Sequence, residues 1–251
     1  MTVTDRWVLR LRGARTSPGV RLICIPYAGG SPEAFRAWSA DLAPHVELLA
    51  VQLPGRGPRL REPLYEDWKP LLDDTFAALA PYLDEPHAFY GHSFGGRLAY
   101  ELTHLAETRF PGRTRRLFVA GCRSPDVPQR TPLLHTRSDG DFRAALREMG
   151  GSPDEVLSSD LLMAMLLPTI RSEIRLAELW QDWHPGGVSA PITAVYGRDD
   201  PIDSHPEMRH WPRYSRDRGD VAELAGGHFF MTSHGPELVH IINTRLEDGD
   251  G

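Results

Sequence analysis

A serine enclosed by glycines constrains the fold of this chain more than any other feature. Residues 91–95 read Gly-His-Ser-Phe-Gly, after an apolar segment at 87–90 and before a stretch with leucines at helical spacing. A serine on so tight a turn between strand and helix projects its hydroxyl above the sheet, and only glycine leaves room on either side. The segment therefore predicts a nucleophile elbow with Ser93 as nucleophile, the alternative being an ordinary turn with a capping serine.

Short apolar segments rich in β-formers alternate with helical patterns along the chain. The expected strands are residues 7–11, 21–26, 46–53, 87–90, 116–121, 192–196 and 221–224. Helical periodicity lies between them, at 35–42 and 71–83, and again at 236–246. This alternation predicts an α/β class protein with a mainly parallel central sheet and helices on both faces. With the elbow, it predicts the α/β-hydrolase fold in a single domain over residues 1–251.

The stretch from about residue 124 to residue 187 interrupts the alternation. It contains helical patterns at 142–149, 154–167 and 170–180, with no strand pattern between them. Open α/β sheets bind their ligands at the carboxyl edge of the strands, and an insertion between two strands lies over that edge. We therefore expect a helical lid above the site.

The elbow requires an acid and then a histidine later in the chain. Asp200 follows a late strand and is the expected acid, with Asp199 and Asp203 as alternatives. His228 follows the last expected strand, after two glycines and before two phenylalanines. In this arrangement His228 takes the proton of Ser93, and Asp200 holds the imidazole in the required tautomer.

Two backbone N–H groups are needed to stabilise an oxyanion. One is expected from Phe94, directly after the nucleophile, and the other from the loop after an early strand. Residues 27–31 (Tyr-Ala-Gly-Gly-Ser) form that loop, and Ala28 is the expected donor. A plain flexible turn is the alternative for this loop.

Composition and charge limit the other classes. The net charge of −6 provides no general basic footprint for nucleic acid. No signal-peptide pattern and no apolar stretch long enough for a membrane span are present, so a cytoplasmic protein is expected. Cys24 and Cys122 lie in apolar segments and are expected to be reduced. No metal-ligand spacing, phosphate loop or dinucleotide fingerprint is found, so we expect no metal and no cofactor.

Several further segments add to these motifs. They are residues 25–31, 51–56, 90–96, 99–102, 166–173, 197–201 and 226–230, with Phe35 and Trp38. Together they resemble the stand-alone (type II) thioesterases that accompany modular polyketide and nonribosomal peptide synthases. The segment 51–56 (Val-Gln-Leu-Pro-Gly-Arg) is absent from many other α/β-hydrolases, and the combination is more specific than any one motif.

The resemblance implies a substrate, a partner and further site residues. Such enzymes hydrolyse acyl groups from the phosphopantetheine of an acyl or peptidyl carrier protein, through an acyl-enzyme, and clear stalled or wrongly primed chains. A monomer is expected. Tyr27 and Gly29 in the oxyanion loop, with Met163 and Leu166 in the lid, are the expected substrate-binding residues. Packing in the core is the alternative for the two lid residues.

Three residues depart from the pattern that the resemblance sets. Gly96 stands where alanine is frequent, Arg97 where small or apolar residues are frequent, and Trp180 near an expected tyrosine. They bear on the acyl preference and not on the reaction. The same triad also serves a carboxylesterase or an acyltransferase that excludes water. A non-catalytic binding member of the fold is a further alternative, against which the intact triad argues.

Overall fold

The computed structural model describes residues 6–14, 19–129, 131–150, 154–184 and 186–247. In this part of the chain seven strands form one sheet: β1 (Val8–Arg12), β2 (Val20–Ile25), β3 (Val46–Val51), β4 (His87–His92), β5 (Thr114–Ala120), β6 (Ile192–Gly197) and β7 (Gly219–Leu224). Their order is β1-β3-β2-β4-β5-β6-β7. β1 runs antiparallel to β3, and the other neighbouring pairs are parallel, which confirms the predicted mainly parallel sheet.

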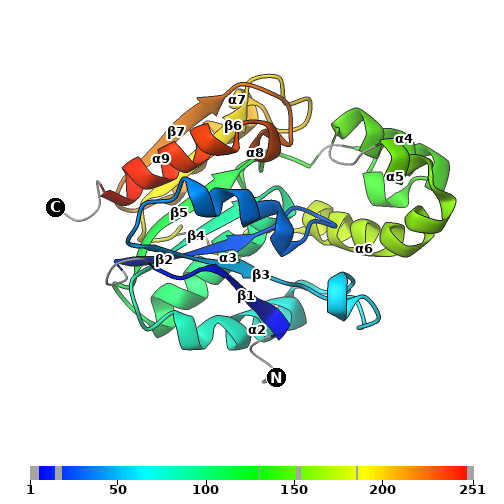
Figure 1. Cartoon of the computed structure of the whole chain (residues 1–251). Helices are drawn as coiled ribbons and strands as arrows, with labels where there is room; N and C mark the ends of the chain where they lie inside the picture. The colour runs from blue at the N-terminus through cyan, green and yellow to red at the C-terminus, as the bar shows by residue number, and fades with distance from the viewer. Residues whose placement is uncertain (1–5, 15–18, 130, 151–153, 185, 248–251) are drawn as a thin grey trace.

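Helices cover both faces of the sheet (Figure 1). On one face lie α2 (Trp68–Leu79), continued by η3 (Ala80–Tyr82), and α3 (Phe94–Arg109). On the other lie η1 (Pro32–Ala40), α8 (Phe230–Ser233) and α9 (Gly235–Glu247). Both faces are therefore apolar, and alternate residues of each central strand supply them. In β2, for example, Ile23 packs under α3 while Cys24 packs under η1. Shorter elements are η2 (Gly57–Arg59), α7 (His205–Met208) and η5 (Trp211–Tyr214).

A helical insertion lies between β5 and β6, at the carboxyl edge of the sheet (Figure 1). It consists of η4 (Leu134–Thr136), α4 (Asp139–Met149), α5 (Asp154–Ser158) and α6 (Asp160–Leu179). The insertion has a small apolar core of its own, to which Phe142, Leu157, Met163 and Leu167 contribute. This separate core stabilises the insertion where its helices do not pack against the sheet.

The helix boundaries in the insertion differ from those expected. The expected helical patterns ended at residue 167 and resumed at residue 170, but α6 continues through Pro168 between them. The chain breaks instead at Ser159, whose side chain caps α6 at the N–H of Leu162. A proline inside a helix costs about 3 kcal/mol. Burial on both sides offsets that cost, since Leu167 packs in the insertion core and Leu176 packs against the main core.

Both cysteines, Cys24 and Cys122, are free thiols inside the core. None of the helices that the structure describes is sufficiently long and apolar to cross a membrane.

The stability of the fold is expected to fall in mild acid. His87 at the start of β4 is fully buried and contacts the carbonyl of Glu85 and the hydroxyl of Thr114. Burial lowers the pKa of His87 from 6.5 to about 4. Below pH 6.5 the unfolded chain binds a proton that the folded chain does not accept until about pH 4. The free energy of unfolding therefore drops by roughly 3 kcal/mol over that range from this residue.

Urea unfolding of the parent and of His87→Gln between pH 7 and pH 4 measures this contribution. The variant is expected to have the weaker pH dependence, because glutamine takes up no proton. Parallel curves for the two proteins would show that His87 is not the group responsible.

Candidate active site

Ser93 occupies the turn between β4 and α3 in a strained backbone conformation. Its φ of 55° and ψ of −117° make it the single non-glycine residue with positive φ in the described part of the chain. Such a conformation costs of order 1–3 kcal/mol and persists only where the surrounding structure enforces it. Ser93 therefore has the backbone conformation that the elbow motif predicts.

Contacts between backbone atoms enforce this turn. A Cβ atom on Gly91 would lie 2.0 Å from the carbonyl oxygen of Gly95. A Cβ atom on Gly95 would lie 2.4 Å from the carbonyl oxygen of Ile25 at the end of β2. Both glycines are thus required by close packing, because rigid backbone stands where any side chain would begin.

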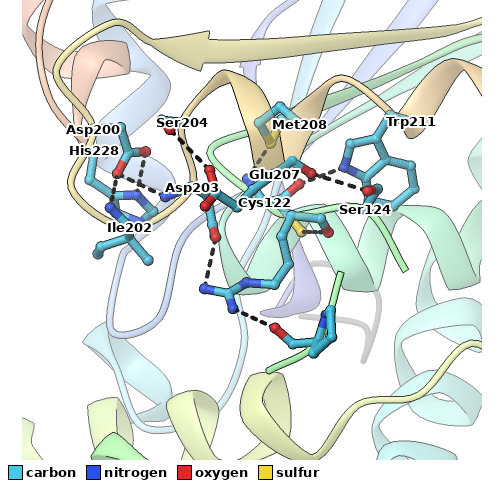
Figure 2. A network of polar contacts seen from close by, with 12 residues as sticks. Cys122, Ser124, Asp200, Ile202, Asp203, Ser204, Glu207, Met208, Trp211 and His228 are labelled. Atoms are coloured by element: carbon cyan, nitrogen blue, oxygen red, sulfur yellow. Dashed lines mark hydrogen bonds and ion pairs between the residues drawn. The ribbon is translucent and has the colours of Figure 1, made fainter. Parts of the chain in front are cut away.

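Asp200 and His228 come together from the loops after β6 and β7 (Figure 2). His228 Nδ1 lies 2.8 Å from Asp200 Oδ2, and both residues are buried. The other carboxylate oxygen, Oδ1, accepts from the N–H groups of Ile202 and Asp203 at 2.8 and 3.1 Å. Burial raises the pKa of the Asp200 carboxyl, but the hydrogen bonds from His228 and these N–H groups outweigh it, and the pKa is lowered. An ionised Asp200 then accepts a hydrogen bond from the Nδ1–H group of His228, which leaves Nε2 as the ring nitrogen that can accept a proton.

The two rival acids have other environments. Asp199 is exposed, and Asp203 Oδ1 lies 2.8 Å from Arg123 Nη2 in a buried ion pair. In Figure 2 Asp203 lies beside Asp200 with its carboxylate turned away from His228. Of the three candidates, Asp200 is the one in contact with His228.

His92 supports the loop that carries His228. Its side chain is fully buried, and Nε2 contacts the carbonyl oxygen of His228 at 2.8 Å, while Nδ1 contacts the hydroxyl of Tyr90 at 3.2 Å. Burial lowers the pKa of His92 to about 3, so the ring is neutral at pH 7. The histidine inside the motif therefore positions backbone and does not face the cavity described below.

The two expected oxyanion donors are backbone N–H groups without an acceptor in the described part of the chain. The N–H groups of Ala28 and Phe94 donate to no atom of the described residues. Phe94 begins α3, so its N–H lies at the positive end of the helix dipole. Both N–H groups are thus available to a developing negative charge.

A buried ion pair that the sequence did not predict anchors the oxyanion loop to the helical insertion. Glu173 of α6 accepts from the N–H of Gly29 at 2.7 Å and pairs with Arg56. Arg56 in turn donates to the carbonyl oxygen of Gly30 at 2.7 Å. Burial raises the pKa of the Glu173 carboxyl, and Arg56 and the Gly29 N–H oppose that effect. The pair holds Gly29 directly beside the candidate donor Ala28.

A cavity of about 350 Å³ brings these groups together under the insertion. Ser93, His228 and Ala28 line it from the edge of the sheet. Its apolar wall comes from the insertion, with Leu134, Ala145, Leu146, Met149, Ile170, Ile174 and Ala177. Ser93 Oγ forms no hydrogen bond with a described residue, and it faces this space. A ligand in the cavity would therefore meet the serine, the histidine and a free N–H at once.

Only one of the four expected substrate-binding residues lines this cavity in the described part of the chain. Tyr27 lines the cavity, whereas Gly29 contributes its N–H to Glu173. Met163 is fully buried in the insertion core and Leu166 packs against that core, and neither lines the cavity. The wall residues Ile170, Ile174 and Ala177 are spaced at i, i+4 and i+7, a signal that was present in the sequence. Within the described ranges, no group of three or more His, Cys, Asp and Glu is placed to hold a metal ion.

Comparison with known proteins identifies the family of the chain. Residues 20–246 match the model of the thioesterase domain family. Thioesterase PikA5 of Streptomyces venezuelae is 34% identical over 242 residues, which cover 96% of this chain and 85% of that protein. The type II thioesterase BorB from the borrelidin biosynthetic cluster superposes with a TM-score of 0.84 at 32% identity and 97% coverage of each chain. The RedJ thioesterase from the prodiginine pathway of Streptomyces coelicolor gives a TM-score of 0.84 at 34% identity, covering 93% of this chain and 95% of that one. The chain thus belongs to the thioesterase family, as an α/β-hydrolase related to the type II thioesterases of polyketide and nonribosomal peptide clusters.

Proposed function

We propose that this thioesterase hydrolyses acyl groups from the phosphopantetheine arm of acyl or peptidyl carrier proteins, and so clears stalled or aberrant chains from a polyketide or nonribosomal peptide synthase. The observation that carries the proposal is the meeting of Ser93, His228 and the free N–H of Ala28 at one cavity under the insertion. The type II thioesterases among its relatives support the choice of substrate.

The first half of the reaction forms an acyl-enzyme. Ser93 Oγ attacks the thioester carbonyl carbon while Nε2 of His228 takes the hydroxyl proton. Asp200 holds the Nδ1 proton and stabilises the imidazolium. The N–H groups of Ala28 and Phe94 stabilise the oxyanion of the tetrahedral intermediate. When the intermediate collapses, the C–S bond breaks and His228 returns its proton to the pantetheine sulfur.

The second half releases the acid. Water enters the cavity, and His228 removes one of its protons as the oxygen attacks the carbonyl carbon of the Ser93 ester. The same two N–H groups stabilise the second oxyanion. The C–O bond to Ser93 then breaks, and the serine regains its proton from His228. In both halves the Nδ1 proton of His228 stays on the Asp200 side of the ring while Nε2 gains and loses a proton, and His92 holds the backbone carbonyl of His228.

A panel of short to medium acyl groups on carrier-protein phosphopantetheine tests the proposal. Mass spectrometry of the carrier follows the loss of each acyl group, and Ser93→Ala serves as control. We expect turnover by the parent and faster hydrolysis of the thioester than of its oxygen-ester analogue. A folded parent that turns over no carrier-bound acyl group, but does cleave oxygen esters, would instead assign a carboxylesterase.

Breaking the ion pair under the oxyanion loop is expected to lower both stability and rate. Glu173→Gln leaves the buried Arg56 without a counter-charge, which costs about 3–5 kcal/mol in unfolding free energy. Loosening of the Ala28 loop is expected to lower kcat by roughly 100-fold, as loss of one oxyanion donor does. Chemical denaturation and steady-state kinetics on the same acyl-carrier substrate measure the two effects.

A double variant separates the two effects. Replacing both Arg56 and Glu173 by methionine removes the buried charges together and is expected to recover most of the unfolding free energy. It is not expected to restore kcat, because methionine at both positions leaves the Gly29 N–H and the Gly30 carbonyl without the side-chain partners that hold the loop. A double variant with the parent's kcat would show that the oxyanion loop needs no such anchor.

A further inference from the structure

Arg97 is a buried cation without a protein counter-charge. It lies on α3 four residues after Ser93, about 6 Å further along the helix axis, and therefore on the same face of the helix. Its residue exposure is 8%, and its Nε is buried without a hydrogen-bond partner. Among the residues that the structure describes, the side chain of Arg97 makes no hydrogen bond and no ion pair. Its one charge-related contact is the ring of Trp180, 5.5 Å from the guanidinium carbon.

The buried carboxylates nearest the cavity are engaged elsewhere. Asp203 pairs with Arg123. Glu178 accepts from the N–H groups of Leu134 and His135 and from the His135 ring. Neither carboxylate is therefore left to compensate Arg97.

The same is true on the far side of Arg97. Glu101, one turn further along α3, accepts from Trp180 Nε1 at 2.7 Å and contacts His184 Nε2 at 2.9 Å. The remaining charged residues of the cavity, Arg137 and Glu148, are of opposite sign and lie at its more open margin. Asp182 lines a neighbouring pocket with Arg97, but its Oδ1 accepts from the N–H of His184. Among the described residues no carboxylate thus pairs with Arg97.

Arg97 reaches the cavity that contains the nucleophile. Both residues line the same space of about 350 Å³, together with Arg123. A buried guanidinium without a partner is costly, and an anion that binds beside it recovers the cost with two parallel hydrogen bonds. The compensating anion must then be carried by the ligand.

We propose that Arg97 binds a carboxylate at the distal end of the acyl group, so that the preferred substrates are monothioesters of short dicarboxylic acids. This inference rests on the proposed function and specifies its substrate class. The phosphate of phosphopantetheine is the other anion on such a substrate. It is separated from the thioester carbon by the length of the pantetheine arm, whereas Arg97 is one helical turn from Ser93.

The test compares malonyl with its neutral isostere malonamyl, each loaded on carrier-protein phosphopantetheine. The two groups differ only in whether the distal carboxylate is replaced by an amide. We expect the parent to favour malonyl in kcat/KM, and Arg97→Met to lower the malonyl-to-malonamyl ratio by about 10- to 100-fold, the range of a charge-assisted hydrogen bond. Arg109→Met, on the exposed far end of α3, is the matched control and is expected to leave the ratio unchanged.

Thermal melting provides a readout that is independent of turnover. Because the substrate-free protein buries an unpaired charge, Arg97→Met is expected to melt at a higher temperature than the parent, whereas Arg109→Met is not. A lower melting temperature for Arg97→Met would show that the arginine stabilises the fold, and would count against the proposal.

Two outcomes would overturn the inference while the proposed function stands. One is a malonyl-to-malonamyl ratio that is the same in the parent and in Arg97→Met. The other is an equal loss for both groups that disappears when acyl-pantetheine without phosphate replaces acyl-phosphopantetheine, which would assign Arg97 to the phosphate. No turnover of any carrier-bound acyl group by the folded parent would overturn both proposals.

Discussion

Replacing Ser93 by alanine is expected to lower kcat for a carrier-bound acyl group by roughly a million-fold. Loss of the nucleophile in a triad enzyme costs about as much as loss of the whole triad. The residual rate over water comes from binding and from the two oxyanion donors. Single-turnover kinetics with excess enzyme measure it, and mass spectrometry of the parent is expected to show an acyl adduct that the variant lacks. Activity within 100-fold of the parent would exclude Ser93 as nucleophile.

The strained backbone at Ser93 also leads to a prediction about the free energy of unfolding. At φ 55° alanine retains the backbone strain that serine has, whereas glycine adopts this region freely. Relief of about 1–3 kcal/mol of strain exceeds the roughly 0.5–1 kcal/mol that glycine costs through the unfolded chain. We therefore expect Ser93→Gly to unfold at higher denaturant than Ser93→Ala, although both are inactive.

Ser215 is the control for this comparison. Its φ of −105° and ψ of 133° are ordinary extended values. Ser215→Gly is therefore expected to be less stable than Ser215→Ala, the reverse of the order at Ser93. The same order at both positions would mean that the elbow stores no strain.

Replacing Asp200 by asparagine is expected to lower kcat by about 10⁴-fold without disturbing the fold. The N–H groups of Ile202 and Asp203 hold Oδ1, so the amide oxygen takes that place and the amide NH₂ faces His228. Nδ1 of His228 must then accept, and its proton moves to Nε2, where the base is needed. A triad with the wrong tautomer loses activity to about this extent.

Asp199→Asn is the control for the charge change. Asp199 is adjacent in sequence, but it is exposed. Its substitution is expected to change kcat less than threefold. A loss of less than tenfold for Asp200→Asn, with unaltered denaturation curves, would show that His228 does not depend on this carboxylate.

Short-range patterns in the sequence determined much of the architecture. All seven strands of the sheet were expected within two residues at each end, because buried parallel strands are continuous apolar segments that turn residues interrupt. The elbow at Ser93 was predictable because its steric requirement for glycine is local. The pairing of Asp200 with His228 followed from the order in which the elbow motif takes its partners.

Tertiary structure decided what depends on packing between distant segments. Pro168 normally ends a helix, and burial on both sides of it keeps α6 continuous. Met163 was expected at the cavity or in the core. The packing of α6 against α4 places it in the core of the insertion, in one cluster with Phe142. Leu166 packs there for the same reason.

The electrostatics of the site also depend on the three-dimensional arrangement. Arg56 and Glu173 are 117 residues apart in the chain, so no local pattern predicts their pairing under the oxyanion loop. The sequence places Arg97 one helical turn from Ser93. It does not show that Asp203 and Glu178 are engaged with other groups, and that knowledge identifies Arg97 as an unpaired charge beside the nucleophile. Local sequence thus specified the strands and the elbow because their constraints act over a few residues, whereas the partners of buried charges are set by the complete fold.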